Sequence, residues 1–353
     1  MTTGSGSLGN IQERAETFLD RAIGAFRGRT GRTRDPIIVP YSGYQHASGT
    51  RVLGRVMEQP GTWSPLETDS RWANMRGIGT LFATHEIAHA PVALRDGPVR
   101  AETATDHEGY IDETIPADGL PERTAWDTIE ASLSDVDSGA SEAMPVLRVG
   151  RNARFGIVSD IDDTVMQTGA ENLARNLWTT FTGNPLTRHV YRHVPALYRG
   201  LVEHGGVPTN PVFYLSSSPW NLYSLIEEVL KRNHVPRGPI FLRDFGLDRD
   251  KFIKNTHGQH KVGNAVRLLD QFDGLPFILI GDLGQADAEV YADVARQRPG
   301  QVIGVILHQP SDRSHDAKLR HVAEFEALGI PSLVTRDYAD AIALAREKGW
   351  MDD

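Results

Sequence analysis

The sequence predicts an α/β domain built on a parallel sheet and, ahead of it, a small all-β sandwich. Length is the first observation, because 353 residues exceed one average domain and suggest about two. The second is a hydrophobic period of two between about residues 36 and 150. The third is the alternation of short apolar runs with helical patterns from residue 151 onward. We therefore expect an N-terminal segment at 1–35, a β-sandwich with its linker at 36–150 and an α/β domain at 151–353.

Composition narrows the class of protein. Hydrophobic residues make up 40% and charged residues 24% of the chain, which is ordinary for a globular protein. The formal net charge of -9 argues against nucleic acid as a partner. Cysteine is absent, so disulfide frameworks, thiolate metal sites and thiol nucleophiles are excluded. No apolar run approaches the roughly 20 residues that span a bilayer, and we expect a soluble, cytoplasmic protein.

The N-terminal segment has an amphipathic pattern. Apolar residues between 11 and 26 recur at spacings of three and four, which predicts one helix of about four turns. Four arginines follow within residues 27–34, with no acidic residue among them. One interpretation is peripheral membrane contact through residues 11–34, because a basic amphipathic helix binds anionic lipid. The alternative is a helix packed on its own domain, which is the commoner behaviour of surface helices.

Residues 36–150 carry the signals of a β-sandwich. Short β-rich runs occupy 37–39 and 51–56. Asp96-Gly97 predicts a hairpin turn between the runs at 91–94 and 99–103. Residues 126–133 supply a further strand, and the polar stretch at 134–142 is expected to be a linker.

Residues 151–353 predict a parallel sheet. The buried strands are expected at 155–159, 212–215, 277–280 and 302–307. Helical periodicity is found at 220–233, 259–272, 285–296 and 337–348. Ligands of such sheets bind at the carboxyl ends of the strands, so polar residues there are candidates for a functional site.

An acidic cluster follows the first of these strands. Asp160, Asp162 and Asp163 lie within four positions and repel one another, so a compensating cation is expected. Oxygen ligands without Cys or His favour Mg²⁺. The alternative is a helix N-cap or a solvated turn.

Polar residues also follow the later strands. Ser216, Ser217 and Ser218 come at the end of the second strand, where hydroxyl and backbone N–H groups suit phosphoryl oxygens; an ordinary serine-rich helix start is the alternative. Asp282 and Asp287 follow the strand at 277–280 and could complete a metal site. Lys261, near a helix start, is placed to meet a phosphate, or is simply exposed.

The order Asp-x-Asp-x-Thr, strand-end Ser, helix-start Lys and Gly-Asp-x-x-x-x-Asp resembles the four motifs of the haloacid dehalogenase phosphatase superfamily. The resemblance implies a HAD-like (Rossmannoid) parallel sheet with a small helical cap. It implies that Asp160 is the nucleophile, and that Asp162 protonates the leaving oxygen and then activates water. It further implies a phosphoryl contact from Ser216, charge balance from Lys261, substrate binding by Thr164, Ser217 and Ser218, and Mg²⁺ held by the Asp160 side chain, the Asp162 carbonyl and Asp282 with Asp287 supporting.

The residues around these motifs make the resemblance more specific. The sequence over about residues 145–307 looks like the catalytic domain of the actin-patch phosphatidate phosphatase family. That resemblance implies hydrolysis of phosphatidate, a lipid phosphate, to diacylglycerol and phosphate. One departure is Leu283, where a small polar residue is expected. Two alternatives stay open: the same chemistry on a soluble phosphoester, and a non-catalytic binding or scaffold protein whose β-sandwich does the work.

The long segment between the first two motifs raises a separate hypothesis. Residues 167–210 are expected to form the cap, with apolar Trp178 and Phe181 meeting acyl chains and three arginines meeting phosphate. The alternative is a cap that only closes its own core. The three arginines are Arg188, Arg192 and Arg199.

One further motif is rejected. His85-Glu86-Ile87-Ala88-His89 matches the zinc metalloprotease string, which requires a helix. Pro91 and the Asp96-Gly97 hairpin continue a strand pattern instead. We predict a strand with two polar histidines.

Overall fold

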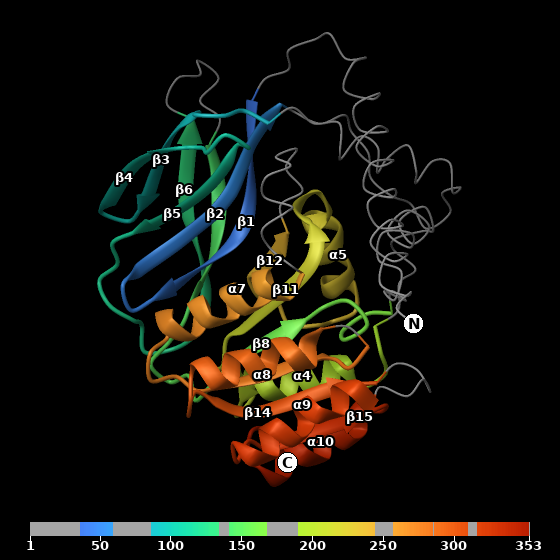
Figure 1. The fold of residues 1–353 in the computed structure, drawn as a ribbon. Helices are drawn as coiled ribbons and strands as arrows, with labels where there is room; N and C mark the ends of the chain where they lie inside the picture. The colour runs from blue at the N-terminus through green and yellow to red at the C-terminus, as the bar shows by residue number, and fades with distance from the viewer. Residues whose placement is uncertain are drawn as a thin grey trace, which may run out of the picture.

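The structure, a computed structural model, describes residues 36–58, 86–133, 141–167, 190–243, 257–284, 286–309 and 316–352. Figure 1 shows an all-β unit beside an α/β unit that contains the C-terminal end of the chain. Within the described ranges, no helix is long and apolar enough to cross a membrane. The amphipathic helix and arginines predicted at 11–34 lie outside these ranges.

The β unit is a single seven-stranded sheet. Its strands are β1 (Pro36–His46), β2 (Gly49–Glu58), β3 (Pro91–Asp96), β4 (Val99–Ala104), β5 (Tyr110–Ile115), β6 (Ala125–Leu133) and β7 (Ser141–Arg148). They lie in the order β4-β3-β6-β7-β1-β2-β5. Neighbours are antiparallel except β1 and β7, which are parallel. Gly43 sits where the β1 register shifts, and a Cβ there would lie 2.2 Å from the Arg51 carbonyl oxygen, so this close approach requires glycine.

The sheet curls so that its two outer strands meet. Thr103 Oγ1 on β4 donates to Glu113 Oε2 on β5 at 3.0 Å. Apolar side chains from all parts of the curled sheet form one core, among them Val52, Leu94 and Ile129. The all-β character predicted for this segment is confirmed, but one nearly closed sheet stands where two separate sheets were expected, because the β1–β7 pairing joins the two halves edge to edge.

The predicted hairpin is confirmed as β3 and β4, with Gly97 at φ 55° in the turn. The expected linker at 134–142 is partly wrong, because Ser141 and Glu142 already belong to β7. Residues 86–89 of the zinc motif form neither a helix nor a strand, so the strand predicted there is wrong. Glu86 makes an isolated bridge to Met57, His89 has a left-handed φ of 56° in a turn, and His85 lies outside the described residues.

The α/β unit contains a fully parallel sheet of six strands. They are β8 (Gly156–Asp160), β11 (Val212–Pro219), β12 (Ile240–Arg243), β13 (Phe277–Asp282), β14 (Val302–His308) and β15 (Ser332–Thr335), in the order β12-β11-β8-β13-β14-β15. Numbered along the chain this is 3-2-1-4-5-6, the order of a doubly wound sheet. The predicted parallel α/β fold is confirmed. The order in which successive strands are added to the sheet reverses at β8 and β13, and a ligand crevice is expected there, at the carboxyl ends of these two strands.

Helices lie between these strands and after the last of them. They are α4 (Val194–Val202), the short η3 (Trp220–Leu222), α5 (Tyr223–Arg232), α7 (His257–Gln271), α8 (Asp287–Gln297), α9 (Asp316–Ala327) and α10 (Tyr338–Glu347). After α4, the two-residue strands β9 (Glu203–His204) and β10 (Val207–Pro208) pair with each other. Contacts run from α7 to α8 and from α8 to α9, whereas α10 packs on α4. Right-handed crossovers place these two groups on opposite faces of the sheet.

The predicted cap is not confirmed. Helix α4, inside the expected cap at 167–210, is the crossover between β8 and β11. Its residues Val194, Leu197, Tyr198 and Leu201 are buried in the main core. Residues 168–189, which include Trp178, Phe181 and Arg188, lie outside the described residues.

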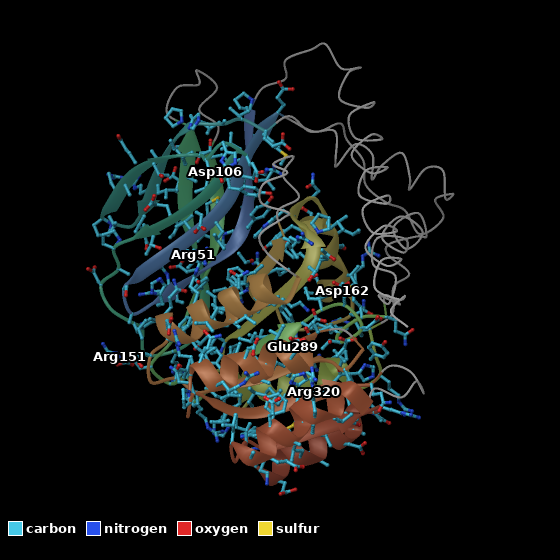
Figure 2. All side chains as sticks on the ribbon, in the orientation of Figure 1. Arg51, Asp106, Arg151, Asp162, Glu289 and Arg320 are labelled. Carbon is cyan, nitrogen blue, oxygen red and sulfur yellow. The ribbon has the colours of Figure 1, made fainter. Side chains whose placement is uncertain are left out.

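The hydrophobic core of the α/β unit extends to one side of the β unit, and it is distinct from the core inside the curled sheet. Tyr44 of β1 is fully buried, and its ring lies edge-on to Phe213 of β11 at 5.3 Å. Its hydroxyl donates to Gln271 Oε1 on α7 at 2.5 Å. Arg51, labelled in Figure 2 on the β unit, pairs with Asp112 at 2.6 Å and lies 5.6 Å from the Phe241 ring. The β unit is therefore packed directly on the sheet that carries the acidic cluster.

Candidate active site

Asp160 is the last residue of β8, the strand at the reversal point of the sheet. Its side chain is 1% exposed. Lys261 Nζ donates to Asp160 Oδ1 at 2.6 Å, and Thr164 Oγ1 donates to Oδ2 at 3.0 Å. Figure 2 shows the neighbouring Asp162 close to the carboxyl end of β8. Both oxygens of this buried carboxylate are therefore hydrogen-bonded, and the carboxylate lies at the sheet position where a ligand is expected to bind.

A tight turn brings Thr164 back onto Asp160. The amide groups of Val165 and Met166 both donate to the Ile161 carbonyl, at 2.9 and 3.1 Å. Asp163 has φ 58°, in the left-handed region that Asp tolerates better than most residues. The alternative of a solvated turn is wrong, because Asp160, Asp162 and Asp163 are all buried.

Asp162 is held by the serine segment after β11. Ser216 Oγ donates to Asp162 Oδ2 at 2.6 Å, and Ser218 Oγ donates to the same oxygen at 3.2 Å. The Ser218 amide donates to Ser216 Oγ at 3.0 Å. Ser216 and Ser218 therefore contact the predicted acid, whereas Ser217 between them is partly exposed.

Lys261, near the start of α7, bridges two carboxylates. Its Nζ lies 2.6 Å from Asp160 Oδ1 and 2.7 Å from Asp287 Oδ1. Asp287 Oδ2 accepts the amide of Asp282, the last residue of β13, at 3.1 Å. A Cβ at Gly281 would lie 2.7 Å from Asp287 Cβ, so the glycine lets α8 approach the strand end. The alternative of an exposed lysine is wrong, because Lys261 is 5% exposed.

Negative charge exceeds positive charge in this cluster. The carboxylates of Asp160, Asp162, Asp282 and Asp287 are all buried here, and the Lys261 ammonium contacts those of Asp160 and Asp287. Burial, followed by the charge of Asp287, raises the pKa of Asp160 well above its usual range, and Lys261 only partly opposes this. Burial lowers the pKa of Lys261, but the two carboxylates beside it outweigh burial and raise that pKa overall. A cation would relieve this repulsion.

The carboxylates match a hard cation in chemistry. Asp160 and Asp282 end the adjacent strands β8 and β13. Gly284 lies close to the Asp282 carboxylate, because a Cβ at Gly284 would be 2.9 Å from Asp282 Oδ2. As they stand, no three acidic or His side chains among the described residues surround a common metal position. Lys261 occupies the space between Asp160 and Asp287. Both Asp287 oxygens are engaged, so its geometry suits a supporting position.

Two side chains that were not predicted from the sequence form hydrogen bonds with the backbone of the turn at Asp163 and Thr164. His308, the last residue of β14, lies 2.9 Å from the Asp163 carbonyl through Nδ1. Tyr338 of α10 donates to the Thr164 carbonyl at 2.7 Å. Burial lowers the pKa of His308. His308 could have been found, because it ends an apolar strand at the same sheet edge as Asp160 and Asp282; Tyr338 carried no such signal.

The structure gathers most of the predicted site residues. Those brought together are Asp160, Asp162, Thr164, Ser216, Ser218, Lys261, Asp282 and Asp287. Leu283, the departure from the expected motif, is 1% exposed, and its amide donates to the His308 carbonyl at 2.8 Å.

The predicted phosphate contact of Arg199 is wrong. Arg199 lines a surface pocket with Arg237 and Ile240, which begins β12, and so lies by the amino ends of the strands. The site is at their carboxyl ends. Arg192, by contrast, precedes α4 and is exposed.

Comparison with known proteins finds a family match over the part of the chain that contains these residues. Residues 155–309 match the family model described as phosphatidate phosphatase APP1, catalytic domain, and that span includes all the residues gathered above. The chain resembles the APP1 catalytic domain. The resemblance predicted from the motifs is therefore confirmed.

Two curated relatives extend the comparison with APP1. The chain is 27% identical over 243 residues to phosphatidate phosphatase APP1 of Saccharomyces cerevisiae, covering 67% of this chain and 40% of that protein. It is 28% identical over 213 residues to an uncharacterized protein of Schizosaccharomyces pombe, covering 58% of this chain and 34% of that one. The chain thus spans well under two thirds of either relative.

The similarity of the chain to solved structures is low. A carbohydrate acetylesterase from Xanthomonas citri has a TM-score of 0.33 at 14% identity, with 86% of this chain and 69% of that chain covered. A likeness this low indicates neither fold nor activity.

Proposed function

We propose that this chain is a Mg²⁺-dependent phosphoric monoester hydrolase that works through a phosphorylated Asp160 and acts on phosphatidate. The observation that carries the proposal is the buried Asp160 carboxylate, which Lys261 and Thr164 hold at 2.6 and 3.0 Å, two residues before Asp162. The APP1 catalytic-domain match covers this constellation.

In the first step, an Asp160 oxygen attacks phosphorus, and the bond between phosphorus and the leaving oxygen breaks. Protonated Asp162 gives its proton to that oxygen, which departs as an alcohol. Lys261, close to Asp160, stabilises the negative charge on the transferring group. The product on the protein is an aspartyl phosphate.

In the second step, Asp162, now ionised, takes a proton from water. The water oxygen attacks phosphorus, the bond to Asp160 breaks, and inorganic phosphate leaves. Asp162 ends protonated, as it began. Ser216 and Ser218, which donate to Asp162 Oδ2, orient this carboxyl group through both steps.

The residues proposed to hold Mg²⁺ are Asp160, Asp282 and the main-chain carbonyl of Asp162, with Asp287 in support. When bound, the ion supplies positive charge to the phosphoryl oxygens. Asp287 meanwhile fixes Lys261 and the Asp282 amide.

Phosphatidate is proposed because the first relative is named as a phosphatidate phosphatase. The test is phosphate release, with Mg²⁺, from phosphatidate in mixed micelles beside p-nitrophenyl phosphate, nucleotides and sugar phosphates. We expect preference for phosphatidate. Preference for a soluble ester would keep the chemistry and reject the lipid substrate, and no turnover of any ester would favour a binding protein.

Mg²⁺ binding is expected to strengthen as pH rises. The pKa of Asp160 is raised in the metal-free chain, so a proton must leave before this carboxylate can bind the ion. Apparent affinity therefore gains up to about tenfold per pH unit while Asp160 is protonated. Calorimetric titration with Mg²⁺ alone measures this.

Two variants serve as the test and the control for the Mg²⁺ titration. Asp282→Asn should weaken binding at least about tenfold, whereas Asp270→Asn, at an exposed acid paired with Arg298, should leave it unchanged. Binding that ignores both pH and Asp282→Asn would reject the metal site.

A further inference from the structure

The serine segment that holds Asp162 extends past the regular sheet. Strand β11 pairs with β8 only as far as Leu215 opposite Asp160. Its pairing with β12 shifts register after Leu215 and resumes at Pro219 opposite Arg243. Ser216 to Ser218 therefore lie between two fixed points, Leu215 and the Pro219–Trp220 end.

That second fixed point contacts the β unit. Trp220, directly after β11, stacks on Tyr41 of β1 with ring centroids 4.7 Å apart and an interplanar angle of 27°. Trp220 also stacks on Tyr223 at 5.8 Å, and Tyr110 of β5 lies 5.9 Å away. Two strands of the β unit thus contact the residue that ends the serine segment.

The same contact is locked by a buried hydrogen bond. The Ser42 amide of β1 donates to the Tyr223 hydroxyl at 2.7 Å. The Tyr41 and Tyr223 rings lie 4.4 Å apart, and both residues are at most 4% exposed. Arg55 extends the cluster by lying 4.4 Å from the centre of the Tyr110 ring. Rings packed on several sides have one arrangement, so they fix the backbone that carries them.

We propose that the β unit positions the active site: the stack of Tyr41, Trp220 and Tyr223 fixes the serine segment so that Ser216 and Ser218 reach Asp162. We assign Tyr41 and Trp220 a positioning role, because their stacked rings fix the backbone at the end of the serine segment. The requirement is strict, since both hydroxyls must meet one oxygen, at 2.6 and 3.2 Å. A shift of about 1 Å would lengthen these hydrogen bonds beyond the useful range.

The inference rests on the proposed phosphatase function for its kinetic test, which is the Tyr41→Ala variant. With p-nitrophenyl phosphate and Mg²⁺, we expect kcat to fall by about 10- to 100-fold, because the hydrogen bonds that orient Asp162 are lost when the serine segment shifts. Tyr41→Phe keeps the stacked ring and should retain most of kcat. Tyr41→Leu, which keeps apolar volume without the ring, replaces Tyr41→Ala if that variant does not fold.

A matched control separates positioning from general loss of stability. Leu94 is as buried as Tyr41 but belongs to the separate core inside the curled sheet. Leu94→Ala should lower the unfolding temperature and leave kcat unchanged. A loss of kcat in Leu94→Ala as large as in Tyr41→Ala would overturn the proposal.

Coupling to the serines gives the sharpest kinetic outcome. In a Ser216→Ala, Ser218→Ala background, Tyr41→Ala should lower kcat by less than about twofold, because residues acting as one unit are not additive. A full, independent loss in that background would show that Tyr41 acts elsewhere and would reject the positioning role.

Hydrogen exchange tests the positioning without activity. Amides of residues 212–223 should exchange faster in Tyr41→Ala than in Leu94→Ala. If the wild-type chain hydrolyses no ester, the proposed function fails while exchange still decides the positioning. Unchanged exchange across this segment in Tyr41→Ala would overturn the inference even if the wild-type chain is active.

Discussion

Asp160→Asn is expected to lower phosphate release by at least about 10⁴-fold, because an amide lacks the nucleophilic oxygen that the first step requires. The fold should survive. Lys261 keeps its second partner, Asp287, at 2.7 Å, and removal of one carboxylate relieves the burial penalty and the repulsion from Asp287 that together raise the pKa of Asp160. We expect the free energy of unfolding to change by less than about 1 kcal/mol. Measurement of kcat beside a urea unfolding curve checks both statements.

The matched variant for this prediction is Asp162→Asn. It leaves the nucleophile in place but removes the group that activates water, so the phosphorylated protein should accumulate with p-nitrophenyl phosphate, whose leaving group needs no proton. Acid quenching and mass spectrometry should then find phosphate on the peptide containing Asp160, and none in Asp160→Asn. Phosphorylation of Asp160→Asn, or its retention of more than about 1% of wild-type activity, would remove Asp160 from the nucleophile role.

The sequence identified the strands that are buried on both faces and missed those at the edges. Continuous apolar runs mark β8, β11, β13 and β14, all inside the parallel sheet. Its two edge strands, β12 and β15, have four residues each, too few to show a pattern. Helix α4 lies in the segment expected to form a cap because that segment separates the first two motifs, and its apolar pattern does not show what the helix packs against.

The site was predictable as a set of strand ends but not as a set of contacts. Parallel topology makes the ends of β8, β11 and β13 converge, so Asp160, Ser216 and Asp282 could be grouped from the sequence. Which oxygen each group meets depends on side-chain geometry that spacing does not encode. The Ser42 to Tyr223 bond, across 181 residues and two units, had no local signal at all.

Ser216 is an example of a residue whose position was predictable but whose contact was not. The motif implied a phosphoryl contact, whereas its hydroxyl donates to Asp162 in the structure. A hydroxyl carries one donor and two acceptor positions. The contact with Asp162 uses the proton of Ser216, and the Ser218 amide occupies one acceptor position, so in this arrangement Ser216 has no proton left to donate to a phosphoryl oxygen. Ser217, partly exposed beside it, is the better placed of the two side chains to meet a substrate.

Lys261→Met is expected to destabilise the metal-free protein by roughly 3–5 kcal/mol, the usual cost of leaving a buried charge without its partner. Both Asp160 Oδ1 and Asp287 Oδ1 lie within 2.7 Å of the ammonium nitrogen. Without that ammonium, the two buried carboxylates repel each other across an apolar side chain. The variant should also lose about 10²- to 10³-fold in kcat, as expected when one electrostatic donor is removed.

The loss of stability in Lys261→Met should depend on pH, and the sign follows from Asp160. Its pKa is already raised in the folded chain, and removal of Lys261 takes away an interaction that lowers it, so the folded pKa rises further. A raised folded pKa stabilises the protein below the unfolded value, near pH 4, and this contribution is lost as pH rises through the folded pKa. The destabilisation should therefore be larger at pH 8 than at pH 5. Urea unfolding in EDTA at both values measures it, with exposed Lys348→Met expected to change stability by less than about 0.5 kcal/mol. Equal stability of Lys261→Met and wild type at pH 8 would mean that this lysine does not hold the two carboxylates together.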